Sequence, residues 1–369
     1  MRQRARSLLL FTFVLGVWFV VFEAGLRRWG SSEAAPAFQG LFTGDPVIGY
    51  RLQPGARTRF TTSEFDTEIV INRAGVRDDE ELGPKDRDSV RILVLGDSLV
   101  LSVQVPFAQT FTEQLERHLN GGRSPDRGVS VRVVNAGVQG YGPVEELLLF
   151  RRIVTDVQPD LVLVTVFVGN DAEEALTSQV KLSNDRPYVE ALRESIANRL
   201  RRTVRRSMVL QVLRLRVVAA TSRFRSTPVA PEPPLPSYAR NPVPRITRGI
   251  ELTRDALAQL AEEARRAGAR TGILLMPARF QVDDGDYGRL REIVARAGGE
   301  LQRDAASERF AAALGELGLP MLDLLPALRQ APTGPDLFFQ ENVHLTLRGH
   351  AVVAEALARF VREQRLLAH

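Results

Sequence analysis

The sequence predicts an α/β fold, a three-layer α/β/α arrangement around a central parallel sheet of about five strands. Short apolar runs have the length and composition of buried strands, and they fall at residues 92–95, 131–134, 161–166, 272–276 and, more weakly, 321–324. Segments of helical periodicity alternate with them, at residues 107–119, 144–154, 247–266, 306–317 and 347–365. Strands that alternate with helices in this way form parallel sheets with helices on both faces.

The N-terminal segment has the pattern of a membrane anchor. Three basic residues, Arg2, Arg4 and Arg6, precede an almost unbroken apolar run over residues 8–22. This length lies between the core of a signal peptide and the roughly 20 residues that span a bilayer. Because no good cleavage site follows, we expect residues 1–28 to be a cytoplasmic N-terminus and a transmembrane signal anchor, with the rest of the chain extracytoplasmic. A buried core helix and a cleaved signal peptide are the alternatives.

Two further segments lie outside the alternating pattern. Residues 29–88 predict a spacer and a small β appendage, because polar and apolar residues alternate around residues 59–60 and 68–72. The main domain, residues 89–369, contains an insertion at about residues 175–245, with eleven arginines in residues 186–226 and a proline-rich tract after them. We interpret the insertion as a solvated helical face with a linker. The alternatives are a lid over the active site and a basic surface on anionic lipid headgroups.

Composition excludes several function classes. The chain has 369 residues, a net charge of +5 and a pI near 10.0, but Lys85 and Lys181 are the only lysines among the 49 basic residues. We attribute the arginine excess to codon usage and expect no nucleic-acid partner. The absence of cysteine excludes disulfides, thiolate zinc sites, cysteine nucleophiles and a lipoprotein anchor. Four scattered histidines offer no metal-ligand spacing, so we expect neither a metal nor a cofactor.

A serine follows the first strand of the predicted sheet. The sequence Leu-Gly-Asp-Ser at residues 95–98 places Ser98 at the carboxyl end of that strand, just before a helix. Open α/β sheets bind their ligands at this edge, where helix N-termini add partial positive charge. A serine that only caps the helix is the alternative for this motif by itself.

Three further motifs follow later strands in the same way. The segment at residues 135–141 contains Gly140, the segment at residues 167–171 contains Asn170, and the C-terminal segment Glu-Asn-Val-His contains His344. With Ser98, these blocks resemble the SGNH (GDSL) hydrolase family over about residues 88–366. The resemblance implies a flavodoxin-like sheet order. The stretch before residue 88 resembles the leader of membrane-anchored bacterial members of the family.

The resemblance assigns a role to each block. Ser98 is the expected nucleophile and His344 the expected base, and the Ser98 and Gly140 backbone N–H groups with the Asn170 amide form the expected oxyanion hole. The imidazole needs a group that fixes its tautomer, and a carboxylate three residues earlier can reach its second nitrogen. The family has Asp there, whereas this chain has Glu341. We expect Glu341 to complete the triad, with Asp336 and a Ser-His dyad as alternatives.

These observations predict a serine esterase that removes acetyl or other short acyl groups from an extracytoplasmic glycan. The same acyl-serine intermediate also suits an O-acyltransferase that modifies a surface polysaccharide, with polysaccharide-modification machinery as the partner. A lipid esterase or thioesterase is a third hypothesis, suggested by the membrane anchor. The hypothesis from another class is a glycan-binding protein that keeps the fold without turnover.

Overall fold

Five parallel strands form the central sheet of the computed structural model, which describes residues 40–121, 130–183, 235–331 and 335–367. They are β5 (Ser89–Gly96), β6 (Ser130–Gly137), β7 (Leu161–Phe167), β8 (Arg270–Met276) and β9 (Met321–Asp323). Their spatial order is β6-β5-β7-β8-β9, and every neighbouring pair is parallel. This is the flavodoxin-like order, in which the chain reverses direction across the sheet at the first strand. The prediction of a central parallel sheet of about five strands is confirmed.

Strand β5 shows why the sheet is covered on both faces. Its side chains alternate between two hydrophobic clusters, with Leu93 and Leu95 in one and Ile92 and Val94 in the other, all of them fully buried. Successive side chains of a strand point to opposite faces, so an unbroken apolar run requires apolar cover on each side.

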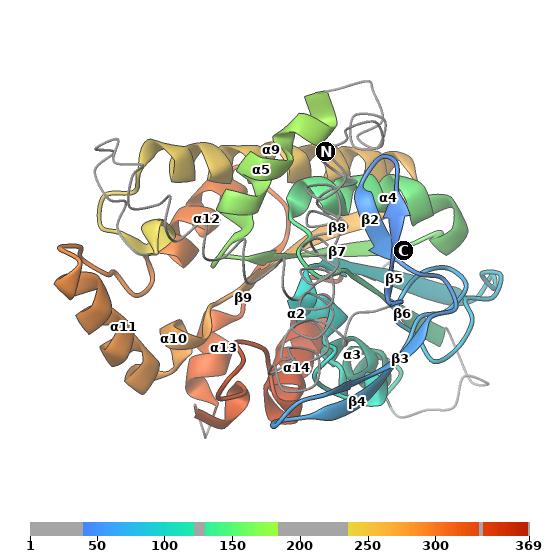
Figure 1. The fold of residues 1–369 in the computed structure, drawn as a ribbon. Coiled ribbons are helices and arrows are strands. Elements are labelled where there is room, and N and C mark those ends of the chain that lie inside the picture. Colours follow the sequence, from blue (N-terminus) through green and yellow to red (C-terminus); the bar gives the residue numbers. More distant parts are fainter. Residues whose placement is uncertain (1–39, 122–129, 184–234, 332–334, 368–369) are drawn as a thin grey trace, which may run out of the picture. The chain divides into compact units, whose positions relative to one another are not determined.

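The helices supply that cover, as Figure 1 shows. Residues of α4 (Pro143–Val157), α9 (Pro244–Arg266) and α12 (Ala305–Gly315) belong to the first cluster, and α5 (Asp171–Ser183) packs on α9. The second cluster contains residues of α3 (Phe111–Leu119), α13 (Leu325–Gln330) and α14 (Leu347–Glu363). Shorter elements are α2 (Ser98–Leu101), η1 (Phe107–Gln109), η2 (Pro236–Tyr238), α10 (Arg279–Val282), α11 (Asp284–Arg296) and η3 (Pro335–Leu337). The five predicted helices are present, whereas α5, α10, α11 and α13 are not among the segments predicted as helices.

Two antiparallel hairpins precede the main sheet. The first pairs β1 (Phe42–Asp45) with β2 (Gly49–Leu52), and the second pairs β3 (Arg57–Thr61) with β4 (Asp66–Val70). Residues 62–65 connect β3 to β4, and we call them the hairpin tip. These hairpins are the small β appendage that the sequence predicts.

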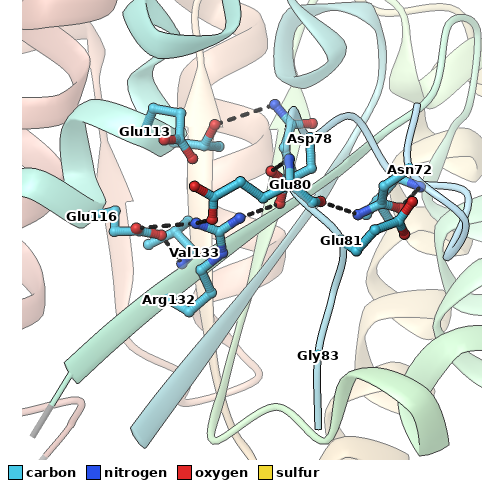
Figure 2. Close-up of polar contacts among 12 residues, drawn as sticks. Asn72, Asp78, Glu80, Glu81, Gly83, Glu113, Glu116, Arg132 and Val133 are labelled. Carbon is cyan, nitrogen blue, oxygen red and sulfur yellow. Dashed lines mark hydrogen bonds and ion pairs between the residues drawn. The ribbon is translucent and has the colours of Figure 1, made fainter. Parts of the chain in front are cut away.

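The segment after β4 is fastened to the main domain by a polar network (Figure 2). Arg132 of β6 donates to the buried carboxylate of Asp78 at 2.7 Å and also pairs with Glu80 and with Glu116 of α3. The Glu116 carboxylate in turn accepts from the Val133 backbone N–H at 2.7 Å. A buried carboxylate that is paired with an arginine holds two segments in one arrangement, because separating them leaves a buried charge.

Two predicted segments fall outside the described residues: the membrane anchor at residues 1–28 and most of the arginine-rich insertion. Of the predicted insertion, the structure describes residues 175–183 in α5 and residues 235–245 around η2. Among the described residues, no helix is both long enough and apolar enough to span a membrane.

Candidate active site

Ser98 lies where β5 passes into α2. Asp97 caps this helix, because its carboxylate accepts from the Leu99 backbone N–H at 2.8 Å. The helix lies unusually close to the neighbouring strand: a Cβ added to Gly137 of β6 would lie 2.2 Å from the Leu101 backbone nitrogen. Only glycine fits there, so the sequence of β6 helps to set the position of the short helix that carries the serine.

His344 lies beside the serine. Its Nε2 atom is 2.8 Å from Ser98 Oγ, although 246 residues separate the two in the chain. Residues 339–344, which we call the histidine loop, precede α14, and Thr346 caps that helix by accepting from the Gly349 backbone N–H. The other histidine near the start of α14, His350, is buried and accepts from the Phe111 backbone N–H through Nδ1 at 3.1 Å. His350 is therefore a packing residue.

The second nitrogen of His344 faces an amide. Asn342 Oδ1 contacts Nδ1 of the imidazole and also accepts from the His344 backbone N–H at 3.2 Å. Glu341, expected at this nitrogen, instead accepts from Ser63 Oγ of the hairpin tip at 2.7 Å. The alternative, Asp336, is exposed, and its backbone carbonyl accepts from a threonine. The structure thus departs from the expected arrangement, because the loop turns the Glu341 side chain toward the appendage.

Burial lowers the pKa of His344 to about 4. Desolvation disfavours the charged imidazolium, and the amide of Asn342 brings no negative charge to offset it. At neutral pH the imidazole is therefore uncharged, the form that can accept a proton.

Gly140 and Asn170 follow β6 and β7. Gly140 has a φ of +69°, which glycine adopts readily, and a Cβ there would lie 3.1 Å from the Tyr50 hydroxyl. Asn170 directly precedes α5, and its Nδ2 donates to Glu174 Oε1 at 2.9 Å. Its Oδ1 has no hydrogen-bond partner among the described residues. With Ser98 after β5, the sheet topology brings three of the four motif loops to its carboxyl edge.

Five carboxyl groups gather at the N-termini of the helices that follow these loops: Asp97, Glu145, Glu146, Asp171 and Glu174. Burial raises the pKa of Asp97 to about 6. The pKa of Glu174 rises to about 8, from burial and then from the charges of Asp97 and Glu145. Burial and neighbouring carboxylates also hold the pKa of Glu146 and Asp171 well above the usual range. No group of His, Asp or Glu side chains arranged to hold a metal occurs in the part of the chain that the structure describes.

Fold and site together define an α/β protein with a serine and a histidine in contact at the carboxyl edge of its sheet, as in SGNH-type hydrolases. Residues 239–369 match the family model described as the SGNH hydrolase-like domain of the acetyltransferase AlgX. This match supports an SGNH-type hydrolase family for the chain, the family that its motifs resemble. The matched segment contains His344, whereas Ser98, Gly140 and Asn170 precede it.

Solved structures of esterases share parts of this fold. The psychrotrophic esterase EstA from Pseudoalteromonas sp. is 11% identical, with a TM-score of 0.40, and the match covers 74% of this chain and 98% of that one. The lipase/acylhydrolase from Enterococcus faecalis is 16% identical, with a TM-score of 0.39 and coverage of 74% and 96%. The acetylxylan esterase Axe2 from Geobacillus stearothermophilus is 14% identical, with a TM-score of 0.39 and coverage of 74% and 94%. No curated protein matches the chain.

Proposed function

We propose that the protein is a serine esterase that cleaves acetyl or other short acyl esters of a glycan outside the cytoplasmic membrane. The observation that carries the proposal is the 2.8 Å separation of His344 Nε2 and Ser98 Oγ. A serine hydroxyl is a weak nucleophile until a neighbouring base takes its proton, and an uncharged imidazole at hydrogen-bonding distance is such a base. The extracytoplasmic location rests on the basic and apolar pattern of residues 1–28.

In the first step, Ser98 Oγ attacks the acyl carbon while its proton passes to His344 Nε2. Asn342 Oδ1 can only accept, so Nδ1–H of the imidazole donates to it and the lone pair of Nε2 faces the hydroxyl. This neutral amide fixes the tautomer as a carboxylate would, but it stabilises the imidazolium less. The low pKa of His344 agrees with that weaker support.

The carbonyl oxygen becomes negative as the new bond forms. We assign its stabilisation to the backbone N–H groups of Ser98 and Gly140 and to the side-chain amide of Asn170. An amide has two N–H groups, and the bond from Asn170 to Glu174 uses one, which leaves the other for the oxyanion. One donor of this kind is typically worth about 2.7–4 kcal/mol of barrier.

The intermediate then collapses: His344 returns its proton to the leaving sugar oxygen, and the bond between that oxygen and the acyl carbon breaks. In hydrolysis, water attacks the acyl carbon with His344 again as the base, and the bond to Ser98 Oγ breaks as His344 returns the proton to that oxygen. In the second candidate function, O-acyl transfer, a polysaccharide hydroxyl takes the place of water. The match of residues 239–369 to a domain of the acetyltransferase AlgX favours this candidate as the main alternative.

A fluorophosphonate probe tests the proposal on the full chain. The wild type should be labelled at Ser98, and Ser98→Ala should lose the label. His344→Ala should slow labelling strongly, because the hydroxyl then lacks its base. A properly folded wild type that resists labelling would favour the glycan-binding protein of the same fold.

Product analysis separates hydrolysis from transfer and identifies the class of ester. p-Nitrophenyl acetate is the donor, and an unacetylated polysaccharide is offered as acceptor. An esterase releases one acetate for each p-nitrophenol whether or not the acceptor is present, whereas a transferase places acetyl groups on the polysaccharide. Faster turnover of long-chain esters or thioesters than of acetate would favour the lipid esterase or thioesterase.

A further inference from the structure

The hairpin tip lies directly against the histidine loop. Ser63 Oγ donates to Glu341 Oε2 at 2.7 Å, and Glu64 Oε1 accepts from the Gln340 backbone N–H at 2.6 Å. The contacts are therefore side chain to side chain and side chain to backbone, on two successive residues of the loop. Nearly 280 residues separate the partners in the chain, so the appendage and the C-terminal loop meet only in the folded molecule.

Aromatic side chains of the hairpin tip and the histidine loop also pack against each other. The ring of Phe65 at the hairpin tip lies 5.5 Å from the ring of Phe339 at the start of the histidine loop, centroid to centroid. Phe60 of β3 lies 5.3 Å from Phe65, so the contact continues into the hairpin. Ring pairs at this separation attract each other beyond the area that they bury.

The hairpin tip is itself held in one conformation. The Thr62 backbone N–H donates to the Phe65 carbonyl at 2.8 Å, and Thr62 Oγ1 accepts from the Glu64 backbone N–H at 3.1 Å. Just beyond the tip, the Asp66 carboxylate binds Arg59 on the opposite strand. A turn closed by its own side chains presents Ser63 and Glu64 in fixed positions.

The same appendage also binds the segment that follows Ser98. Thr67 of β4 donates through Oγ1 to the Gln104 carbonyl at 3.3 Å. In the segment after β4, the buried guanidinium of Arg77 donates to the carbonyls of Leu101 and Val105 at 2.7 Å each. The appendage thus contacts the serine side and the histidine side of the site at once.

We propose that the hairpin tip is a positioning element of the active site. Ser63 and Glu64 hold the histidine loop so that His344 remains within hydrogen-bonding distance of Ser98. Glu341 then acts through Ser63, as a positioning residue. This inference rests on the proposed serine chemistry. A misplacement of about 1 Å can cost about 10²-fold in rate, so loosening one anchor of the loop should cost about tenfold.

A double-mutant cycle on the full chain tests the inference. Ser63→Ala, Glu341→Ala and the double variant are compared in kcat and KM for p-nitrophenyl acetate and in the rate of fluorophosphonate labelling. Each single variant should lose about tenfold in kcat with little change in KM. The double variant should be no slower than either single variant, because both substitutions remove the same contact.

Substitutions of Glu64 separate positioning from a general structural role. Glu64→Gln keeps an acceptor for the Gln340 N–H and should retain activity, whereas Glu64→Ala should lose about as much as Ser63→Ala. The matched control is Glu68→Ala on the same hairpin, since the pair of Glu68 and Arg57 is more than half exposed. The control should leave kcat unchanged.

The outcomes distinguish the two proposals. A wild type without labelling contradicts the serine chemistry itself. A labelled wild type with unchanged Ser63→Ala and Glu64→Ala variants overturns the positioning role. A loss of about 10⁴-fold in Glu341→Ala with an unchanged Ser63→Ala also overturns it, since that pattern is expected of a triad carboxylate.

Discussion

The Tyr50 hydroxyl donates a 2.6 Å hydrogen bond to the carbonyl of Gln139, the residue that precedes Gly140. The backbone of Tyr50 in turn accepts from the hydroxyl of Tyr141, the residue that follows Gly140. The residues on both sides of Gly140 are therefore hydrogen-bonded to Tyr50 of the first hairpin. Since Gly140 adopts a left-handed φ, the peptide on either side of it fixes where its N–H points.

We predict that Tyr50→Phe reduces kcat by about tenfold, below the 10²–10³-fold that loss of a whole oxyanion-hole donor costs. The Gln139 carbonyl loses its partner, and the Gly140 N–H becomes less well oriented. Steady-state kinetics with p-nitrophenyl acetate measure the effect. Tyr238→Phe is the matched control, because its hydroxyl bonds to Gln281 and not to a motif loop. Equal kcat values for Tyr50→Phe and the wild type would contradict the prediction.

The pKa of His344 predicts the acid limb of the pH profile. The base must be unprotonated to take the Ser98 proton, and burial lowers its pKa to about 4. A lowered pKa keeps the imidazole neutral down to that pH, so kcat/KM should rise through about pH 4 and stay level toward neutrality. The profile of kcat/KM reports the free enzyme. An acid limb near 6.5, the ordinary value of histidine, would contradict it.

Substitution of Asn342 should shift the acid limb of the kcat/KM profile along the pH axis. In Asn342→Asp a carboxylate faces Nδ1, favours the imidazolium and should raise the pKa of His344 by about 1–3 units. The acid limb of kcat/KM should then move to higher pH. In Asn342→Ala the tautomer of His344 is no longer fixed, so kcat should fall while the acid limb of kcat/KM stays at the same pH. A limb that stays near pH 4 in Asn342→Asp would mean that Asn342 does not contact the imidazole in solution.

The sheet could be predicted because the residues that specify each strand are neighbours in the sequence. Strand β5 contains an unbroken apolar run, residues 92–95, whose side chains alternate between two cores, and Gly-Asp-Ser follows where the run ends. Helix α11 had no such signal: of its 13 residues only Asp286 and Val294 are buried, so no apolar stripe marks it. Helices α10 and α13 have only 4 and 6 residues, too few for a period to show.

The residues around His344 were harder to predict. Spacing along the chain placed Glu341 at the imidazole, but the direction of a side chain depends on the conformation of its loop. In the folded chain the Glu341 side chain bonds to Ser63, 278 residues away, and no local pattern encodes such a contact. Asn342 was missed because only carboxylates were considered at Nδ1, although an amide oxygen is also an acceptor.

The buried carboxyl groups make stability depend on pH. Glu146 is almost fully buried, and neither of its oxygens has a hydrogen-bond partner among the described residues. Burial and the charges of Asp97, Glu174 and Glu145 raise its pKa well above the ordinary value. The folded state therefore keeps a proton that the unfolded chain releases above about pH 4.3. Stability must fall as the pH rises from that value toward the raised pKa.

We predict that Glu146→Gln makes the fall of stability with rising pH shallower. Glutamine has nearly the same shape and no proton to lose, and the neighbouring carboxyl oxygens can accept from its amide. The melting temperatures of the two proteins should converge near pH 4.3 and diverge as the pH rises to 8, with the variant more stable. The melting temperature of the variant should still fall somewhat as the pH rises, because Asp171 and Glu174 are still present. Glu68→Gln, which alters an exposed carboxylate, is the control and should follow the wild type. Parallel curves for Glu146→Gln and the wild type would show that Glu146 does not hold its proton in the folded protein.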